Sequence, residues 1–334
     1  MRSWNQNRMQ KRWIIFAFIF ILLWFIETPY AVSQPGSAQE VQSMIEVKDG
    51  FTEEEGSLML TTVASSRSVN VFYLIYAGVH PNMDIYEKTN ESDENYIQRQ
   101  LTLMRSSHQN AIAAAYDMAN IPYALLEQSV RVNSIVPGYP ADGKLQGGDD
   151  ITQIDDVNMT NVDELISYIN TKSVGDAVEV YFLRNNESQS VTLTLASSQD
   201  GESRPLMGVQ LVDVQEIKPD SPDHEVMFDV EKIGGPSAGL IFSLEIYNQL
   251  VEEDITKGYE IAGTGTISDS GAVGAIGGIK HKIVAAHEEG AQIFLCPPSN
   301  YEEALEKWND LETDMQLVPV KSLQEAIDFL QNLS

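Results

Sequence analysis

A short glycine-rich block, Gly-Gly-Pro-Ser-Ala-Gly at residues 234–239, constrains the fold of this chain more than any other feature. Glycine permits backbone conformations closed to other residues, and Pro236 fixes one torsion and lacks an N–H. A strand-like run at 226–230 precedes the block, and a helix-like run at 237–250 follows it. Ser237 is therefore expected where a strand meets a helix N-terminus, beside free N–H groups that can stabilise an oxyanion. Taken alone, the motif also fits a plain turn with a serine N-cap.

A second glycine-rich turn, Gly277-Gly278-Ile279-Lys280, supplies a candidate base. A serine nucleophile needs one, and none of the five histidines lies in a recognisable triad motif. Lysine can serve when burial lowers its pKa, and Lys280 follows the nearly uncharged stretch 272–279. We therefore predict that Ser237 and Lys280 form a dyad, with Lys282 as its solvated neighbour. A surface position for Lys280 is disfavoured, because a cation in the first turn opposes the helix dipole.

Charge and cysteine content exclude several classes of function. The chain has 21 basic and 49 acidic residues, a net charge of −28, which repels nucleic acid. Cys296 is the only cysteine, so neither a disulfide framework nor a cysteine metal site can form. It lies in the apolar run 293–296, which predicts a buried strand. We expect no nucleic-acid partner, no metal and no cofactor.

The N-terminus predicts membrane attachment. Residues 13–26 are continuously apolar, with Arg8, Lys11 and Arg12 before them and Glu27 after. A span needs about 20 residues, and 28–32 can extend this one. The basic flank should stay in the cytoplasm, so residues 1–33 would form a single-pass anchor with the body outside the cell. The alternative is a cleaved signal peptide with small residues at Ala31-Val32-Ser33.

The next region, residues 34–120, carries no recognisable chemistry. Residues 57–63 read as a strand, 69–76 as another apolar element, and 91–118 as compatible with a helix. We treat the region as an extracytoplasmic part of unknown role.

Residues 121–199 have a different character. Strand patterns at 130–136, 151–154, 178–183 and 191–195 surround a helix pattern at 161–172, with turns at 137–141 and 147–150. Together with the stretch PADGKLQGGDDITQIDDV, this order resembles a PDZ domain of the bacterial protease type. The resemblance implies a β-rich domain that adds a peptide to its sheet edge. It places the receiving loop at Tyr123, Ala124, Leu125 and Leu126; these residues equally fit an ordinary core.

Residues 200–334 alternate strands and helices after a polar break at 200–204. Capping-box pairs, Ser299 with Glu302 and Ser322 with Glu325, predict the last two helices. The Gly-Pro-Ser-Ala-Gly block, the Gly-Gly-Ile-Lys block with 281–287, and Thr264-Gly265 resemble the proteolytic domain of Lon proteases, over roughly 205–330. That resemblance implies Ser237 as nucleophile, Lys280 as general base, Thr264 as a supporting hydroxyl and the backbone of Gly235, Pro236 and Ala238 around the oxyanion. Gly234 departs from the family, which often has an acidic residue there.

The whole chain is thus expected to be a multidomain α+β protein: anchor, PDZ-like domain and Lon-type α/β domain. That order resembles the anchored PDZ-containing Lon-like proteases of Gram-positive bacteria. It implies a serine endopeptidase acting on extracytoplasmic peptides or flexible segments, and the resemblance leaves a homo-oligomer open. The sequence has no Walker A pattern, so we expect ATP-independent cleavage. The rivals are an inactive PDZ scaffold and, much less favoured, a nucleotide-binding module at 271–278.

Overall fold

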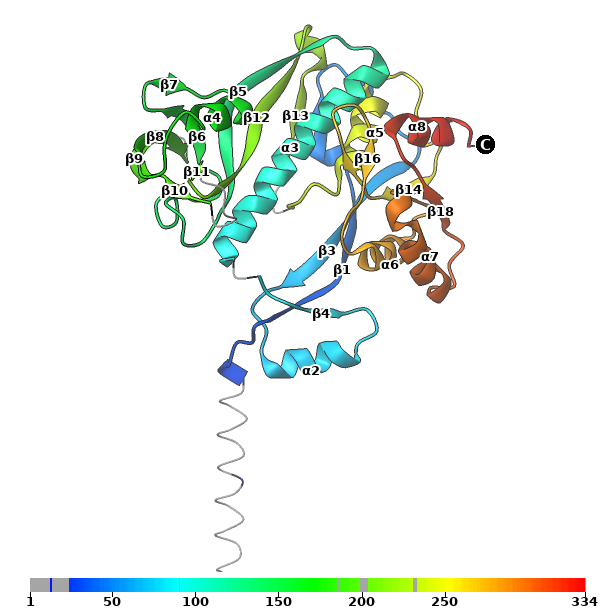
Figure 1. Ribbon diagram of the computed structural model, residues 1–334. Helices are drawn as coiled ribbons and strands as arrows, with labels where there is room; N and C mark the ends of the chain where they lie inside the picture. Colours follow the sequence, from blue (N-terminus) through cyan, green and yellow to red (C-terminus); the bar gives the residue numbers. More distant parts are fainter. Residues whose placement is uncertain are drawn as a thin grey trace, which may run out of the picture.

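The computed structural model describes residue 13 and residues 24–89, 91–185, 187–198, 204–230 and 233–333. Two bodies share the chain, a mixed sheet covered by helices and a smaller β-rich unit (Figure 1). They are joined by the long antiparallel ribbon of β5 (Tyr123–Ile135) and β12 (Val209–Pro219).

The larger body is built on a six-stranded sheet. Its order is β18 (Gln316–Pro319), β17 (Ile293–Cys296), β14 (Glu260–Gly263), β3 (Ser57–Ser66), β1 (Tyr30–Glu40) and β4 (Asp84–Glu87). The strands from β18 to β3 run parallel, whereas β1 is antiparallel to β3 and β4. The predicted strands at 57–63 and 293–296 are both present.

Alternating side chains divide this sheet between two helical layers, because successive residues of a strand point to opposite faces. Leu58 and Leu60 of β3 belong to a core shared with α3 (Asp93–Ala119), α5 (Gly239–Leu250) and α8 (Leu323–Gln331). Met59 between them packs with α6 (Ile279–Glu289) and α7 (Tyr301–Asp310) on the other side. Cys296 also faces that second layer, so it is a buried core residue as expected.

The predicted separation of residues 34–120 from the C-terminal domain is wrong. β3 lies between β14 and β1, so a strand from the supposedly separate region is central to the sheet. α3, which fulfils the helix expected at 91–118, packs on α5 in the same core. The larger body is therefore assembled from segments on both sides of the PDZ-like region.

The smaller body has the elements expected of the PDZ-like region. β6 (Asp150–Ile154), β8 (Ala177–Arg184) and β9 (Glu187–Thr194) extend the sheet from β5, and β7 (Val157–Asn158) pairs with β6. The helix α4 (Val162–Ile169) closes a separate hydrophobic core, which also includes Met207. β12 forms the sheet edge opposite β9.

Shorter elements complete the chain: η1 (Gln42–Met44), β2 (Ile45–Val47), α2 (Val71–Val79), β10 (Ala196–Ser197), β11 (Pro205–Leu206), η2 (Pro222–His224), β13 (Val226–Phe228), β15 (Thr266–Ile267), β16 (Val273–Gly274) and η3 (Pro298–Asn300). Among the described residues, no helix has the length and apolarity needed to cross a bilayer. The predicted anchor falls mostly on residues 14–23, which lie outside the described residues.

Candidate active site

Ser237 lies where the sequence predicts, one residue before the cap of α5. Ala238 occupies the N-cap position, so the simpler reading of the serine as an N-cap does not hold. The carbonyl of Ser237 accepts hydrogen bonds from the Gly265 N–H at 2.8 Å and the Thr264 hydroxyl at 2.9 Å. The predicted supporting position of Thr264 therefore matches the structure: its buried side chain fixes the backbone of the serine turn.

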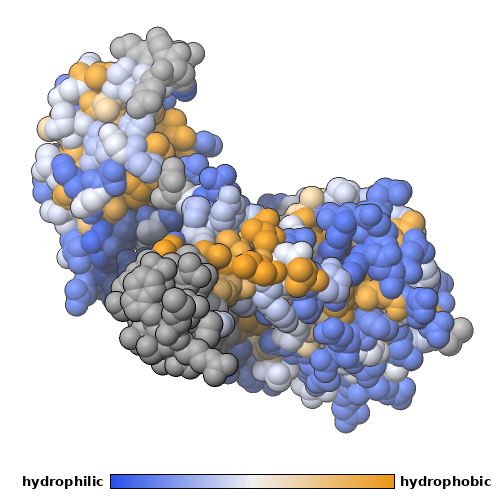
Figure 2. Space-filling model, turned by 90° about the horizontal axis from the view of Figure 1, so that it is seen from below, coloured by the Kyte–Doolittle hydropathy of each residue, from blue (hydrophilic) through white to orange (hydrophobic). Residues whose placement is uncertain are grey.

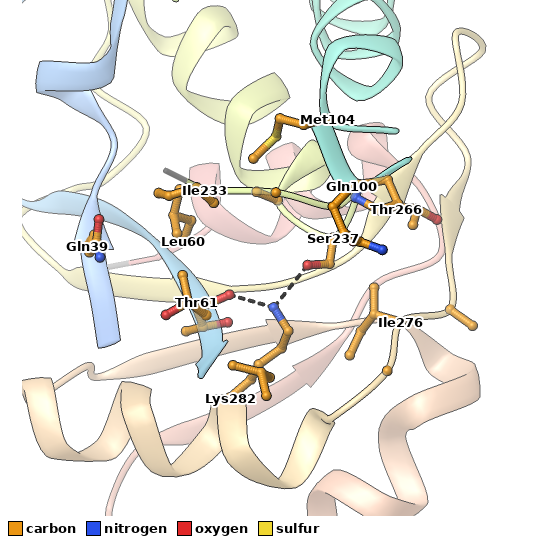
Figure 3. A pocket seen from close by; sticks show the side chains of 18 of the residues that line it. Gln39, Leu60, Thr61, Gln100, Met104, Ile233, Ser237, Thr266, Ile276 and Lys282 are labelled. Atoms are coloured by element: carbon orange, nitrogen blue, oxygen red, sulfur yellow. Dashed lines mark hydrogen bonds between the residues drawn. The ribbon is translucent and has the colours of Figure 1, made fainter. Parts of the chain in front are cut away.

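The lysine that meets this serine is Lys282, not Lys280. Lys282 Nζ lies 3.0 Å from Ser237 Oγ and also donates to the Thr61 carbonyl of β3 (Figure 3). The residue is only 3% exposed, and burial lowers the pKa of its amine to about 8. A substantial fraction of the amine is therefore neutral near pH 8, as a general base requires.

Lys280 points away from the serine, which corrects the sequence prediction. Its amine forms an ion pair with Glu306 of α7 at 2.9 Å, and that carboxylate raises the Lys280 pKa. Residues two apart on a helix lie on nearly opposite sides, so only one of the two lysines can face Ser237. The helix dipole was expected to disfavour a lysine at this exposed position, but the Glu306 carboxylate stabilises the Lys280 cation there.

A signal for Lys282 was present in the sequence. Ile279, Ile283 and Ala286 follow the i, i+4, i+7 spacing of a buried helix face, and all three pack against the sheet. Lys282 stands three residues after Ile279 and belongs to the same face. The lysine on the apolar stripe is thus the desolvated one.

Gly278 explains how α6 comes close enough for this contact. It is the N-cap of α6 with a φ of 71°, a conformation that favours glycine. A Cβ at this position would also lie 2.9 Å from a Val63 side-chain carbon. The glycine therefore brings the first turn of α6 against β3, whose Thr61 carbonyl holds Lys282.

The two side chains open into a cavity of about 680 Å³. Its walls come from the serine turn, from β3, from the 275–277 segment and from the N-terminal half of α3 (Figure 3). Tyr96, Gln100 and Met104 form the α3 wall. This wall was missed in the sequence because 91–118 showed no recognisable chemistry.

The predicted oxyanion residues have unequal positions. Gly235, Pro236 and Ala238 all line the cavity. The Gly235 N–H, however, donates to the Gln100 carbonyl at 2.9 Å, and Pro236 has no N–H. No hydrogen bond from the N–H groups of Ser237 or Ala238 occurs within the described residues. These two groups, rather than those at 235 and 236, are available to a substrate.

The predicted peptide-binding residues of the PDZ-like unit lie elsewhere than expected. Tyr123, Ala124, Leu125 and Leu126 pair with the far end of β12, at residues 216–219. Tyr123 packs against the catalytic core, while the other three are exposed. Tyr123 thus fits the reading as an ordinary core residue, whereas the other three do not. Peptide binding at these four positions stays a prediction.

A groove of about 240 Å³ lies instead between α4 and the start of β12. Its apolar lining includes Ile166 and Ile169 of α4, and Val209 and Leu211 of β12. Because β12 is an edge strand, its outer side can accept a further strand. The sequence analysis assigned the receiving strand to the start of the domain, whereas the structure forms this groove at its end.

Comparison with known proteins agrees with this geometry. The family model for the Lon protease (S16) C-terminal proteolytic domain matches residues 229–332, and the PDZ domain model matches residues 105–195. The chain carries a Lon-type proteolytic domain. A PDZ domain precedes it in the chain.

The relatives share only this part of their length. Lon protease of Mesomycoplasma hyopneumoniae is 33% identical over 96 residues, 29% of this chain and 11% of the relative. Lon protease of Xanthomonas oryzae is 30% identical over 142 residues, 42% of this chain and 16% of the relative. The chain thus spans a small fraction of these curated Lon proteases.

Two solved structures are similar to about a quarter of this chain. The PDZ domain of the SdrC-like protein from Listeria monocytogenes is 30% identical, with 25% of this chain and 88% of that chain covered and a TM-score of 0.24. The second domain of a Listeria protein is 35% identical, with 26% and 85% covered and a TM-score of 0.24.

Proposed function

We propose that this chain is a serine endopeptidase with a Ser237–Lys282 dyad. One observation carries the proposal: a buried amine with a lowered pKa lies 3.0 Å from a serine hydroxyl inside a cavity. By contrast, Lys172, Lys257 and Lys280 each form an ion pair with a carboxylate. A desolvated lysine that meets only a hydroxyl and a carbonyl is suited to proton transfer.

The geometry supports an acyl-enzyme route. Neutral Lys282 takes the proton of Ser237 Oγ while the oxygen attacks the scissile carbonyl, and the protonated amine then delivers that proton to the leaving amine. The Thr61 carbonyl keeps the amine in place throughout. The N–H groups of Ser237 and Ala238 are the proposed oxyanion donors. Water activated by Lys282 then hydrolyses the acyl-enzyme.

The wider setting of the enzyme is part of the same proposal. The apolar run at 13–26 with its basic flank favours a single-pass anchor, with the catalytic body outside the cell. The 334 residues contain no P-loop pattern, so we propose cleavage without ATP, of peptides or flexible segments. The groove between α4 and β12 would capture an extended substrate end by strand addition.

Paired lysine variants test the dyad. Ser237→Ala and Lys282→Arg should each abolish cleavage of an unstructured protein substrate, because arginine does not give up its proton near neutrality. Lys280→Arg is the matched control and should keep nearly full activity, since arginine can still pair with Glu306. Active Lys282→Arg enzyme, with folding verified by circular dichroism, would refute the assignment.

A further inference from the structure

Helix α2 is almost entirely apolar, although most of its residues are at least partly exposed. Its sequence, VFYLIYAGV, has no charged residue, and only Ala77 is buried among its nine positions. Tyr73 and Leu74 pack on a small cluster with Val32 and Val69. The opposite face is open: Ile75 is 62% exposed and Val79 is 80% exposed. An apolar helix face of this kind normally has a partner.

Neighbouring segments extend this surface. Tyr76 continues it on α2, and Ile85 of β4 continues it on the adjacent strand. Figure 2, seen from the end of the molecule where α2 lies, shows apolar residues gathered in a band at this end. We call this surface the α2 face: Ile75, Tyr76, Val79 and Ile85, with Trp24, Phe25, Ile26 and Tyr30.

The α2 face is continuous with the apolar N-terminal sequence. Trp24, Phe25 and Ile26 are the last residues of the uncharged run 13–26, and each is exposed. They lie directly beside α2, because Asn70 donates to the Trp24 carbonyl at 3.3 Å and the Trp24 and Phe72 rings are 6.0 Å apart. The end of the apolar run 13–26 and helix α2 therefore share the same surroundings.

We propose that the α2 face lies in the lipid interface, as a second membrane contact beside the anchor; this inference rests on the proposed anchoring. Its composition fits, since tryptophan and tyrosine favour the headgroup level and the apolar side chains would enter the acyl boundary. α2 has no lysine or arginine, so the contact is apolar rather than electrostatic. With a net charge of −28 on the chain, anionic lipid should weaken it.

The contact would fix the active site relative to the membrane. The cluster under α2 includes Val32 of β1, which pairs with Ser66 at the end of β3. Five residues back along β3, or roughly 16 Å at the usual strand rise, lies Thr61, which holds Lys282. The site would then be held close above the bilayer, where flexible segments of membrane-attached proteins are within reach.

Spin labels in the full chain test this placement. Val79→Cys and Val174→Cys, both exposed positions, would carry a nitroxide in phosphatidylcholine vesicles; Cys296 is buried and stays unlabelled. Accessibility to oxygen reports lipid, and accessibility to a nickel chelate reports water. We expect the label at 79 to be accessible to oxygen and protected from nickel, and the label at 174, on the PDZ unit, to be accessible to nickel.

Two further variants distinguish a failure of the α2 contact from a failure of the anchor. A label at Ile19→Cys, within the apolar run, tests the anchor itself: lipid exposure at 19 with water exposure at 79 overturns the α2 contact and leaves the anchor intact. Water exposure at both positions overturns both. Protection of 79 from both reagents would indicate packing against protein, such as a second copy, and also refutes the proposal. Adding Ile75→Asp should return the label at 79 to water.

Discussion

Burial alone accounts for the lowered pKa of Lys282, which is about 8. The catalytic form is the deprotonated amine, so activity should rise as pH increases through about 8. We therefore expect kcat/KM on a peptide without titrating side chains to increase roughly tenfold for each pH unit below that point, and to level off above it. A profile that is already flat at pH 6 would contradict lysine as the base.

Thr264 acts on the serine through the backbone and is therefore a positioning residue. Its hydroxyl holds the Ser237 carbonyl, so Thr264→Val removes one of the two hydrogen bonds on that oxygen. We expect kcat to fall by about tenfold or more with KM nearly unchanged, since the reacting geometry rather than substrate binding is lost. Thr264→Ser restores the hydroxyl and should recover most of kcat. Loss of kcat in Thr264→Ser together with nearly full kcat in Thr264→Val would instead indicate a packing role for the threonine methyl group.

The site residues that could be predicted were those marked by short, contiguous sequence patterns. Ser237 and Thr264 were found because glycine-rich turns and the Thr-Gly pair are short contiguous patterns. The apolar stripe of α6 already marked Lys282, but the argument against a surface position for Lys280 missed Glu306, which is distant in the sequence. The α3 wall depended entirely on tertiary packing, because Gln100 meets the serine turn from a separate helix.

Helix α5 holds a buried carboxyl group whose effect on the free energy of unfolding depends on pH. Glu245 is fully buried, and desolvation together with the nearby Glu54 raises its pKa to about 8. The folded protein thus keeps a proton that the unfolded chain loses above its ordinary pKa of about 4.3. Stability from this group is present at low pH and is lost as pH rises toward 8.

Glu245→Gln should therefore stabilise the protein more at pH 8 than at pH 5. The amide keeps the shape of the protonated acid and cannot ionise. Thermal unfolding of both proteins across this range measures the difference in Tm, which should widen with pH. Glu288→Gln, the same exchange at an exposed position of α6, is a control for general charge effects. A constant difference would show that Glu245 does not titrate in the folded state.

Element boundaries were predictable where the pattern was regular and not where strands carry unusual residues. Ser322 caps α8 as its capping box predicts, accepting from the Glu325 N–H at 3.2 Å. Ser299 does not cap α7, which begins at Tyr301 after a short 3-10 turn. β1 was missed because it contains Pro35 and Gly36 at a register shift. Gly36 is required there, since a Cβ would lie 2.2 Å from the Thr62 hydroxyl.

At the scale of the whole molecule, α3 and the β5–β12 ribbon couple the PDZ unit to the catalytic body. The Gln109 side chain of α3 accepts a hydrogen bond from the Ile217 N–H of β12 at 2.7 Å. The same helix carries Gln100 and Tyr96 at the cavity wall. β12 lines the peptide groove at one end and contacts α3 near the other. A single strand and a single helix thus connect the two proposed substrate sites.

This arrangement predicts that the PDZ groove affects long substrates only. Ile166 of α4 is 47% exposed and lines the groove, so Ile166→Lys places a charge where an apolar side chain would bind. Cleavage of a protein substrate with an apolar C-terminus should then show a KM increase of about tenfold, because burying the unpaired charge costs more than the contact gains. A peptide too short to reach the groove should be cleaved at the original rate.

Leu125→Lys is the matched control for this groove. Leu125 is 48% exposed, is equally apolar and lies on β5, at the position that the sequence assigned to peptide binding. Because it faces neither groove nor cavity, its change should leave both substrates unaffected. If Leu125→Lys raised KM for the long substrate and Ile166→Lys did not, the substrate end would bind along the β5–β12 ribbon rather than beside α4. The sequence-based position would then be correct, and the groove would have another role.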